Sequence, residues 1–359
     1  MTSYRYVFGE LLTGKVIGEV PLYGVNAMSR LNDAGELRGS VNFDQTGQDN
    51  QDLASMFIPG RSFVVMERED FPVWGGIVWS RTYQSQAKVC QMYCRSWEAF
   101  PGKQRMPTFV RLATEQVNIF RDLWNTMQAD PQRDIGVVVP PSFPTVLAKS
   151  VSVDSFDDKY YGDVMSELAD ADNGFDWTID TSKVEGAYVK TLRIGYPTLG
   201  SPFGSSSVTF EYPGPILNYY ETASISSSGT HIRGIGGGEG SSMLISDVVH
   251  TGLLANGWLR YDVSVPLKFL DNQAILNGVT AQQAAVRKAP TVVIKAQVKG
   301  NLDPVFGSYS LGDGCEVKIT DPMHPGGMSV QTRLTQWVLR PQNDEQTEEV
   351  DLVFEGEDL

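Results

Sequence analysis

Histidine and cysteine are both scarce in this sequence. Of its 359 residues, 3 are histidines and 3 are cysteines. A small, odd number of cysteines excludes a disulfide framework and predicts that the chain folds in a reducing cytoplasm. Three histidines also argue against any chemistry that depends on a histidine cluster.

Basic residues and long apolar runs are lacking as well. The chain has 29 Lys and Arg against 43 Asp and Glu, which gives a formal net charge of −14. This balance argues against a protein that wraps nucleic acid or docks to anionic lipid, because both need a surplus of cations. No apolar run approaches the roughly 18 residues of a spanning helix, and the N-terminus has no signal-peptide core, so we predict no membrane anchor.

Glycine and proline, in contrast, are frequent. The 35 Gly and 19 Pro separate short segments of alternating polarity, which is typical of barrels and sandwiches. We therefore predict a mainly β chain with a smaller α/β part. Residues 1–105 and 213–359 are rich in expected strands, and residues 106–212 are mixed. Exchange of segments between these regions is left open.

Hydrophobic periodicity predicts the individual elements. Val117, Phe120 and Trp124 recur at helical spacing, and a second helix is expected over 159–171. Thr280 and Gln283 form a capping box for a third helix, over 281–288. The expected strands cover 4–8, 15–22, 36–43, 61–67, 73–79, 87–94, 175–180, 291–298, 315–320, 330–339 and 349–355.

Motifs for known chemistry are weak. The glycine-rich run 234–242 does not match the dinucleotide-binding fingerprint, and a bend between strands explains it. Cys90 and Cys94 share one face of an expected strand, about 13 Å apart at 3.3 Å per residue, which favours buried small side chains over a metal site. Carboxylates such as Asp176 and Asp180 leave a glycosidase open, because their distances decide it. We predict no catalytic residue, no metal site and no cofactor.

The run 73–79 reads Val-Trp-Gly-Gly-Ile-Val-Trp. Its glycines are consistent with a core strand that lets a neighbouring element approach. Alternatively, its tryptophans are anchors at a subunit interface. Both explanations stay open. Because aromatic residues and arginine are enriched at interfaces, our candidate interface residues are Trp74, Trp79, Tyr23 and Arg61.

The same residues carry a resemblance to a known family. The pattern comprises Leu22-Tyr23-Gly24, residues 31–37, Pro59-Gly60-Arg61, Glu67-Arg68 and the Trp-Gly-Gly run. It resembles the minor tail proteins of actinobacterial siphophages, which are tail hub proteins similar to the baseplate hubs of contractile-tailed phages. Weaker matches follow in the same order, at 175–177, 234–240 and 311–314, so the resemblance covers nearly the whole chain.

The resemblance implies a fold of two barrel-like β domains with a mixed, helix-containing domain. It therefore implies that 1–105 is a first barrel-like hub domain, 106–212 a mixed α/β domain and 213–359 a second barrel-like domain. It also implies a structural protein without enzymatic activity. The chain would be made in the cytoplasm of the host bacterium and located at the tail tip of the virion.

The resemblance further implies the partners. Three copies would form a homotrimeric hub that contacts the distal tail protein ring, the tape measure protein and other minor tail or tip fibre proteins. The hub would close or line the DNA channel, with DNA as passing cargo. The alternatives are a carbohydrate-binding or glycan-cleaving β protein that acts on the host cell surface, and a peripheral adhesin-like receptor binder.

Overall fold

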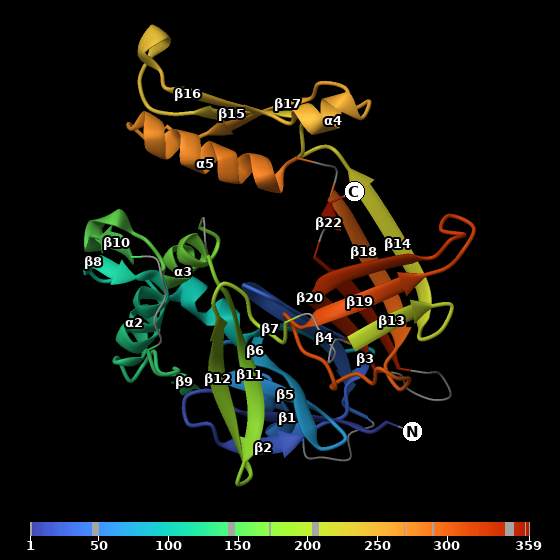
Figure 1. Cartoon of the computed structure of the whole chain (residues 1–359). Coiled ribbons are helices and arrows are strands. Elements are labelled where there is room, and N and C mark those ends of the chain that lie inside the picture. The colour runs from blue at the N-terminus through green and yellow to red at the C-terminus, as the bar shows by residue number, and fades with distance from the viewer. Residues whose placement is uncertain are drawn as a thin grey trace. The chain divides into compact units, whose positions relative to one another are not determined.

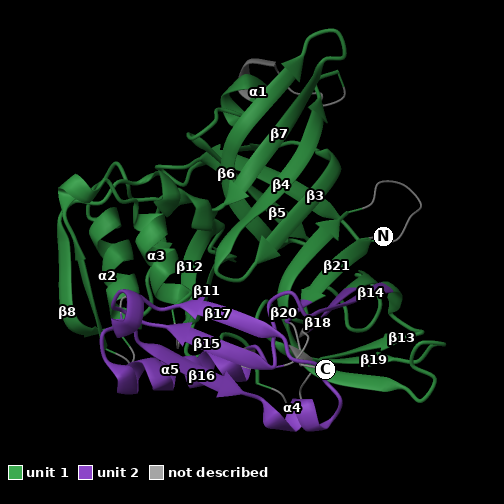
Figure 2. Ribbon diagram, turned by 90° about the horizontal axis from the view of Figure 1, so that it is seen from above, with its two compact units in different colours: residues 1–218, 296–353 green, residues 219–295, 354–359 purple. Residues whose placement is uncertain are grey.

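The computed structural model describes residues 2–44, 50–142, 148–171, 174–202, 208–268, 270–288, 291–341, 348–355 and 357–358. The fold is mainly β with a few helices, as predicted (Figure 1). Its contacts divide the chain into two compact units: unit 1 comprises 1–218 and 296–353, and unit 2 comprises 219–295 and 354–359 (Figure 2). The three-domain division made from the sequence stays a prediction.

A large, mainly antiparallel sheet dominates unit 1. Strands from both ends of the chain lie in it, because β20 near the C-terminus pairs with β3 near the N-terminus. A branch leaves β20 through β19 (Gly314–Ile319) to the parallel strand β13 (Val208–Tyr212). The spatial order is β21 (Glu349–Phe354), β20 (Met328–Arg340), β3 (Tyr23–Arg30), β4 (Asp33–Asn42), β7 (Val89–Ser96), β6 (Phe71–Gln84), β5 (Ser62–Arg68), β1 (Tyr4–Glu10) and β2 (Val16–Glu19).

Unit 1 also contains helix α1 (Asn50–Met56), and three further strands lie at or beyond the boundary with unit 2 in the sequence. Helix α1 contacts β1 and β2. The strands β14 (Ile216–Ser224) and β18 (Thr291–Lys299) each cross the boundary between the units, and β22 (Glu357–Asp358) pairs with β18 inside unit 2.

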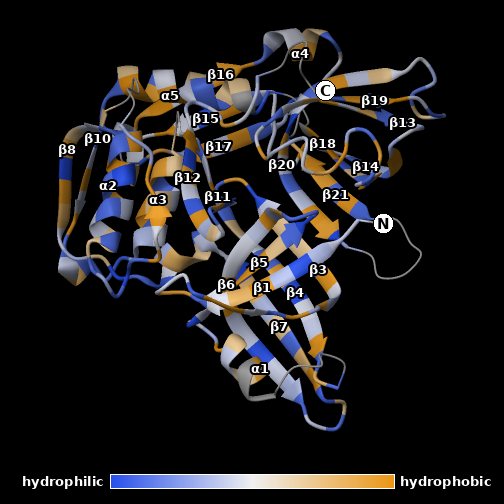
Figure 3. Ribbon diagram, turned by 90° about the horizontal axis from the view of Figure 1, so that it is seen from below, coloured by the Kyte–Doolittle hydropathy of each residue, from blue (hydrophilic) through white to orange (hydrophobic). Residues whose placement is uncertain are grey.

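Alternating polarity explains why these segments form strands. On β7 the side chains of Cys90, Met92 and Cys94 are buried on one face, as predicted. The strand expected over 349–355 is β21, on which Val350, Leu352 and Phe354 alternate with less buried residues and are all buried. Figure 3 shows hydrophobic and hydrophilic residues interleaved along the strands in this way.

A helical layer in unit 1 contains the predicted helices. These are α2 (Gln116–Gln128) and α3 (Tyr161–Ala169), beside the two-stranded sheet of β8 (Phe109–Glu115) and β10 (Ala148–Val153). The apolar stripe of α2 is buried, and the ring centroid of Phe120 lies 5.2 Å from that of Phe175 and 5.1 Å from that of Trp177. This core also includes the sheet of β11 (Asp176–Val184), β12 (Ala187–Gly195) and β9 (Val137–Val138). Short 3-10 helices cover 97–103 (η1) and 155–157 (η2).

Unit 2 is a small three-stranded sheet with one long helix packed on it. The central strand β15 (His231–Ile235) lies between antiparallel β16 (Ile245–Val249) and parallel β17 (Asp262–Pro266). Helix α5 (Gln273–Val286) contacts β15 and β16, and α4 (Thr251–Ala255) follows β16. Gly234 is required here, because a Cβ atom at this position would lie 2.0 Å from Oγ1 of Thr280 on α5.

The structure corrects two expectations. The helix expected over 281–288 begins earlier, at Gln273, because the side chain of Asn272 accepts the N–H of Ala274 at 2.9 Å and caps it. Thr280 is therefore not a cap; inside the helix, its hydroxyl donates to the carbonyl of Leu276 at 2.7 Å. Strand β3 was not predicted. No helix among the described residues is both long and apolar enough to cross a bilayer.

Candidate functional site

The tryptophans of the Trp-Gly-Gly run have different environments. Trp74 is 3% exposed, and its Nε1 donates to the carbonyl oxygen of Met28 at 2.9 Å, which ties β6 to β3. Trp79 is half-buried, with the cationic groups of Arg95 and Lys103 at 5.5 and 5.8 Å from its ring centroid. Trp74 is therefore a core residue of this chain, whereas Trp79 keeps the partial exposure of an interface anchor.

The glycine pair between them admits close neighbours. A Cβ atom on Gly75 would lie 2.5 Å from Oγ1 of Thr181, and one on Gly76 would lie 2.3 Å from the carbonyl oxygen of Arg95. Both positions therefore exclude a side chain, in agreement with the core-strand explanation of this run.

The other two candidates lie on the surface. Tyr23 is 37% exposed and lines a shallow groove of about 520 Å³ on the sheet of β3, β4, β7 and β6. Arg61, just before β5, forms an exposed ion pair with Glu10, in which Nη2 lies 2.9 Å from Oε1. The four candidates do not share one cavity, since Trp74, Tyr23 and Arg61 each line a different one. Their role at an interface stays a prediction.

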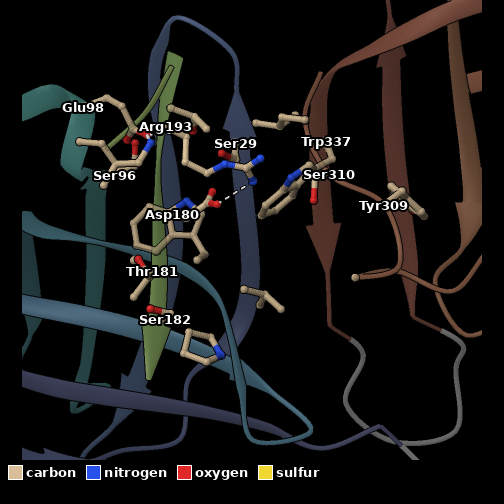
Figure 4. A pocket seen from close by; sticks show the side chains of 18 of the residues that line it. Ser29, Ser96, Glu98, Asp180, Thr181, Ser182, Arg193, Tyr309, Ser310 and Trp337 are labelled. Carbon is tan, nitrogen blue, oxygen red and sulfur yellow. Dashed lines mark hydrogen bonds and ion pairs between the residues drawn. The ribbon is translucent and has the colours of Figure 1, made fainter. Parts of the chain in front are cut away.

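A more enclosed cavity of about 310 Å³ lies between β11, η1, β3 and β20 (Figure 4). Its polar groups are largely used within the fold. The carboxylate of Asp180 lies 3.0 Å from Nη1 of Arg193, and Thr181 accepts the indole N–H of Trp97 at 2.9 Å. The lining includes Ser29, Glu98, Asp180, Arg193, Ser310 and Trp337.

Glu98 is a half-buried acid of this cavity. Its Oε1 accepts the N–H of Ile179 at 2.8 Å and the hydroxyl of Thr178 at 3.2 Å, so the side chain ties η1 to β11. Burial raises the pKa of the Glu98 carboxyl. General acid–base catalysis by this carboxyl would also need the transferred proton of a substrate within hydrogen-bond reach. No histidine or cysteine is among the described residues that line this cavity.

Another acid, Glu67, organises the neighbouring face of the sheet. Its side chain is fully buried and accepts from Nζ of Lys183 and the hydroxyl of Tyr188, both at 2.8 Å, and from Nη2 of Arg5 at 2.5 Å. Burial opposes ionisation, but the hydrogen bonds from Lys183, Tyr188 and Arg5 outweigh it and lower the pKa of Glu67. This network fastens the β11–β12 hairpin to β1 and β5.

Neither the role of Glu67 nor that of Glu98 was predicted from the sequence. Neither has a local signature, because burial of a carboxylate depends on partners that are distant in the sequence. The described residues contain no group of three or more His, Cys, Asp and Glu side chains placed to hold a metal ion. The hydrogen bonds of the two acids therefore account for connections between separate elements of the fold.

Comparison with known proteins gives a result at the level of the fold. The sequence matches no protein family model and no curated protein. The structure, however, resembles the 43 kDa tail protein of prophage MuSo2 from Shewanella oneidensis, with a TM-score of 0.64 and 9% identity over 98% of both chains. It also resembles a tail protein from Neisseria meningitidis, with a TM-score of 0.63 and 13% identity over 98% of this chain and 97% of that one.

The chain has a phage tail protein-like fold. A further similar structure is a chain of the Francisella PdpA–VgrG complex, with a TM-score of 0.57 and 6% identity over 99% of this chain and 58% of that one. The structure is thus similar to phage tail proteins although identity to them is very low, and the resemblance to siphophage minor tail proteins stays a prediction. At such identity the similarity extends to the fold and not to individual residues.

Proposed function

We propose that this chain is a structural component of a phage tail and has no enzymatic activity. The observation that carries the proposal is the similarity to two tail proteins over 97% or more of each chain. Because the match spans nearly the full length on both sides, no large part of this chain is left outside the shared fold. The carboxylates of Glu67 and Glu98 both connect separate elements of the fold, which supports a structural role.

The more specific proposal is a hub at the tip of a siphophage tail. Three copies would form a ring that joins the distal tail protein and the tape measure protein to other minor tail or tip fibre proteins, and would close or line the DNA channel. The net charge of −14 suits a surface past which DNA moves, since excess cations would retain the polyanion. The Francisella complex supports assembly with other proteins as a property compatible with this fold.

Cryo-electron microscopy of the tail tip tests this function. We expect density for three copies of the chain around the tail axis, next to the end of the tube. Density that has no place for the chain at the tip, in virions that contain the protein, would overturn the hub. Saturable binding to cell-wall glycan together with a peripheral position would instead support the carbohydrate-binding alternative.

A further inference from the structure

One aromatic side chain of unit 1 is almost completely exposed. Phe156 in η2 has 93% of its surface exposed, the largest value among the exposed large hydrophobic residues described. An isolated exposed apolar residue is ordinary, but a phenylalanine with so little cover is a good anchor for a partner.

The turn that carries Phe156 is rigid. The N–H of Asp154 donates to Oδ2 of Asp157 at 2.8 Å, and the N–H of Ser155 donates to Oγ1 of Thr108 at 3.2 Å. The same Thr108 hydroxyl lies 3.1 Å from Oδ1 of Asp154. Because the backbone around Phe156 is fixed in this way, docking the ring would cost little conformational entropy.

The turn is also acidic. Asp154, Asp157 and Asp158 surround Phe156 in the sequence, and the described cation paired with them is Arg105, whose Nε lies 3.2 Å from Oδ1 of Asp158. We call Phe156 with these three aspartates the acidic knob. A complementary site would combine aromatic surface with a cation.

The groove that contains Tyr23 has these properties. It has a volume of about 520 Å³, and Gly24, at which a Cβ atom would meet no atom within 4 Å, contributes no side chain to it. Tyr23 and Tyr93 line it with aromatic surface, and Arg38 is the charged residue among those that line it. The polar residues that also line it are Ser40, Ser80, Thr82 and Gln91. The Arg38 side chain is 64% exposed, and its guanidinium group lies 5.3 Å from the Tyr93 ring centroid, with Nε 3.3 Å from Oε1 of Glu36.

The knob and the groove lie on different parts of unit 1. The knob follows β10 in the helical layer, whereas the groove is on the sheet of β3, β4, β7 and β6, and Figures 1 and 2 both show these parts apart. Two different, complementary patches on one chain produce a head-to-tail contact, which closes into a ring when the rotation is right.

We propose that the acidic knob of one copy docks into the Tyr23 groove of a second copy, with Phe156 against the aromatic surface and the aspartates of the knob near Arg38. This inference rests on the proposed trimer and names its contact. It also gives Tyr23 the interface role that the sequence suggested.

Mixing two variants tests the contact. Phe156→Asp removes the knob and Thr82→Trp fills the groove, so each variant alone should associate about 30-fold more weakly than the wild type, as for the loss of a hot-spot residue. Mixed in equal amounts, they should form a one-to-one heterodimer, because one intact knob meets one intact groove. Analytical ultracentrifugation and light scattering at several concentrations measure this. Phe71→Asp, at a 73% exposed phenylalanine elsewhere, is the matched control and should associate like the wild type.

Three outcomes would overturn the inference: a wild-type chain that stays monomeric at all concentrations, variants that associate normally, or a mixture that stays monomeric. Circular dichroism and the urea midpoint must show that both variants are folded. The proposed function fails separately. If the tail tip contains three copies and the Phe156→Asp chain is incorporated normally, the hub stands and this contact is wrong.

Discussion

Arg68 and Glu348 form a buried ion pair although 280 residues separate them in the sequence. Nε of Arg68 lies 2.9 Å from Oε2 of Glu348, and their side chains are 12% and 3% exposed. The hydroxyl of Tyr4 donates to the same carboxylate, and the N–H of Gly300 donates to the carbonyl of Glu348 at 2.9 Å. The pair therefore connects the N-terminal strands β1 and β5 to the start of β21 and the end of β18.

Removal of one partner should destabilise unit 1 strongly. Glu348→Ala leaves the Arg68 cation buried without its partner, and we expect a loss of about 3–5 kcal/mol in the free energy of unfolding. Urea unfolding followed by tryptophan fluorescence measures this, since six of the seven tryptophans lie in unit 1.

Glu36→Ala is the matched control, because Glu36 pairs with exposed Arg38 at the surface. We expect a loss below about 1 kcal/mol for this variant. The double variant Arg68→Met with Glu348→Met should recover most of the stability, since apolar side chains can replace a buried pair. Equal losses of unfolding free energy for Glu348→Ala and Glu36→Ala would show that the buried pair stabilises the fold no more than the exposed pair.

Gly300 should not tolerate a side chain. A Cβ atom there would lie 1.9 Å from Oε1 of Glu348, so Gly300→Ala must displace the carboxylate from Arg68. We expect a loss of about 1–3 kcal/mol, as for an overpacked core. Gly102→Ala is the control, because a Cβ atom at that position meets no atom within 4 Å. A Gly300→Ala chain with the wild-type urea midpoint would contradict the expected clash.

The elements that the sequence predicted correctly are those with a strong local period. The stripe of Val117, Phe120 and Trp124 gave α2, and the alternation of Val350, Leu352 and Phe354 gave β21. In both cases one face is buried along its whole length, so the period survives in the sequence.

Long-range relationships could not be predicted. Strand β3 is bounded by two expected strands but pairs with β20, about 300 residues away, and only its small Val25 and Ala27 are well buried. Glu348 belongs to a stretch rich in acidic residues, yet it is 5% exposed because Arg68 pairs with it. No residue near Glu348 in the sequence indicates that Arg68 is its partner. Which of the candidate interface residues are exposed could not be predicted either, because exposure depends on the whole fold.

The three cysteine thiols should be inert in the folded chain. All three are buried, and burial raises the pKa of Cys90 and brings those of Cys94 and Cys315 to about 12. Because the thiolate is the reactive form, we expect no reaction with a disulfide reagent at pH 8 in buffer, and three reacting thiols in urea. Leu259→Cys, at a position 72% exposed, should add one fast thiol. A fast thiol in the folded wild type would contradict the burial.

The free energy of unfolding of unit 1 should depend on pH because of one buried lysine. Lys190 is 6% exposed, its ammonium group donates to the carbonyl of Ile135, and it lies 4.9 Å from the Trp97 ring centroid. Burial lowers the pKa of Lys190 to about 8, and nearby Asp134 opposes the shift. In the unfolded chain the pKa is about 10.4. Between these values the unfolded state binds more protons, so this lysine makes stability rise with pH from about 8 to about 10.4.

Lys190→Met removes that rise. We expect the urea midpoint of the wild type to rise relative to that of the variant as pH increases from 8 to 10, since other titrating groups affect both chains alike. Lys15→Met is the matched control, because Lys15 is exposed, and its midpoint should follow the wild type at every pH. Parallel curves for the wild type and Lys190→Met would mean that Lys190 keeps an ordinary proton affinity in the folded chain. A steeper rise in the variant would reverse the sign of the linkage and contradict the burial of the ammonium group.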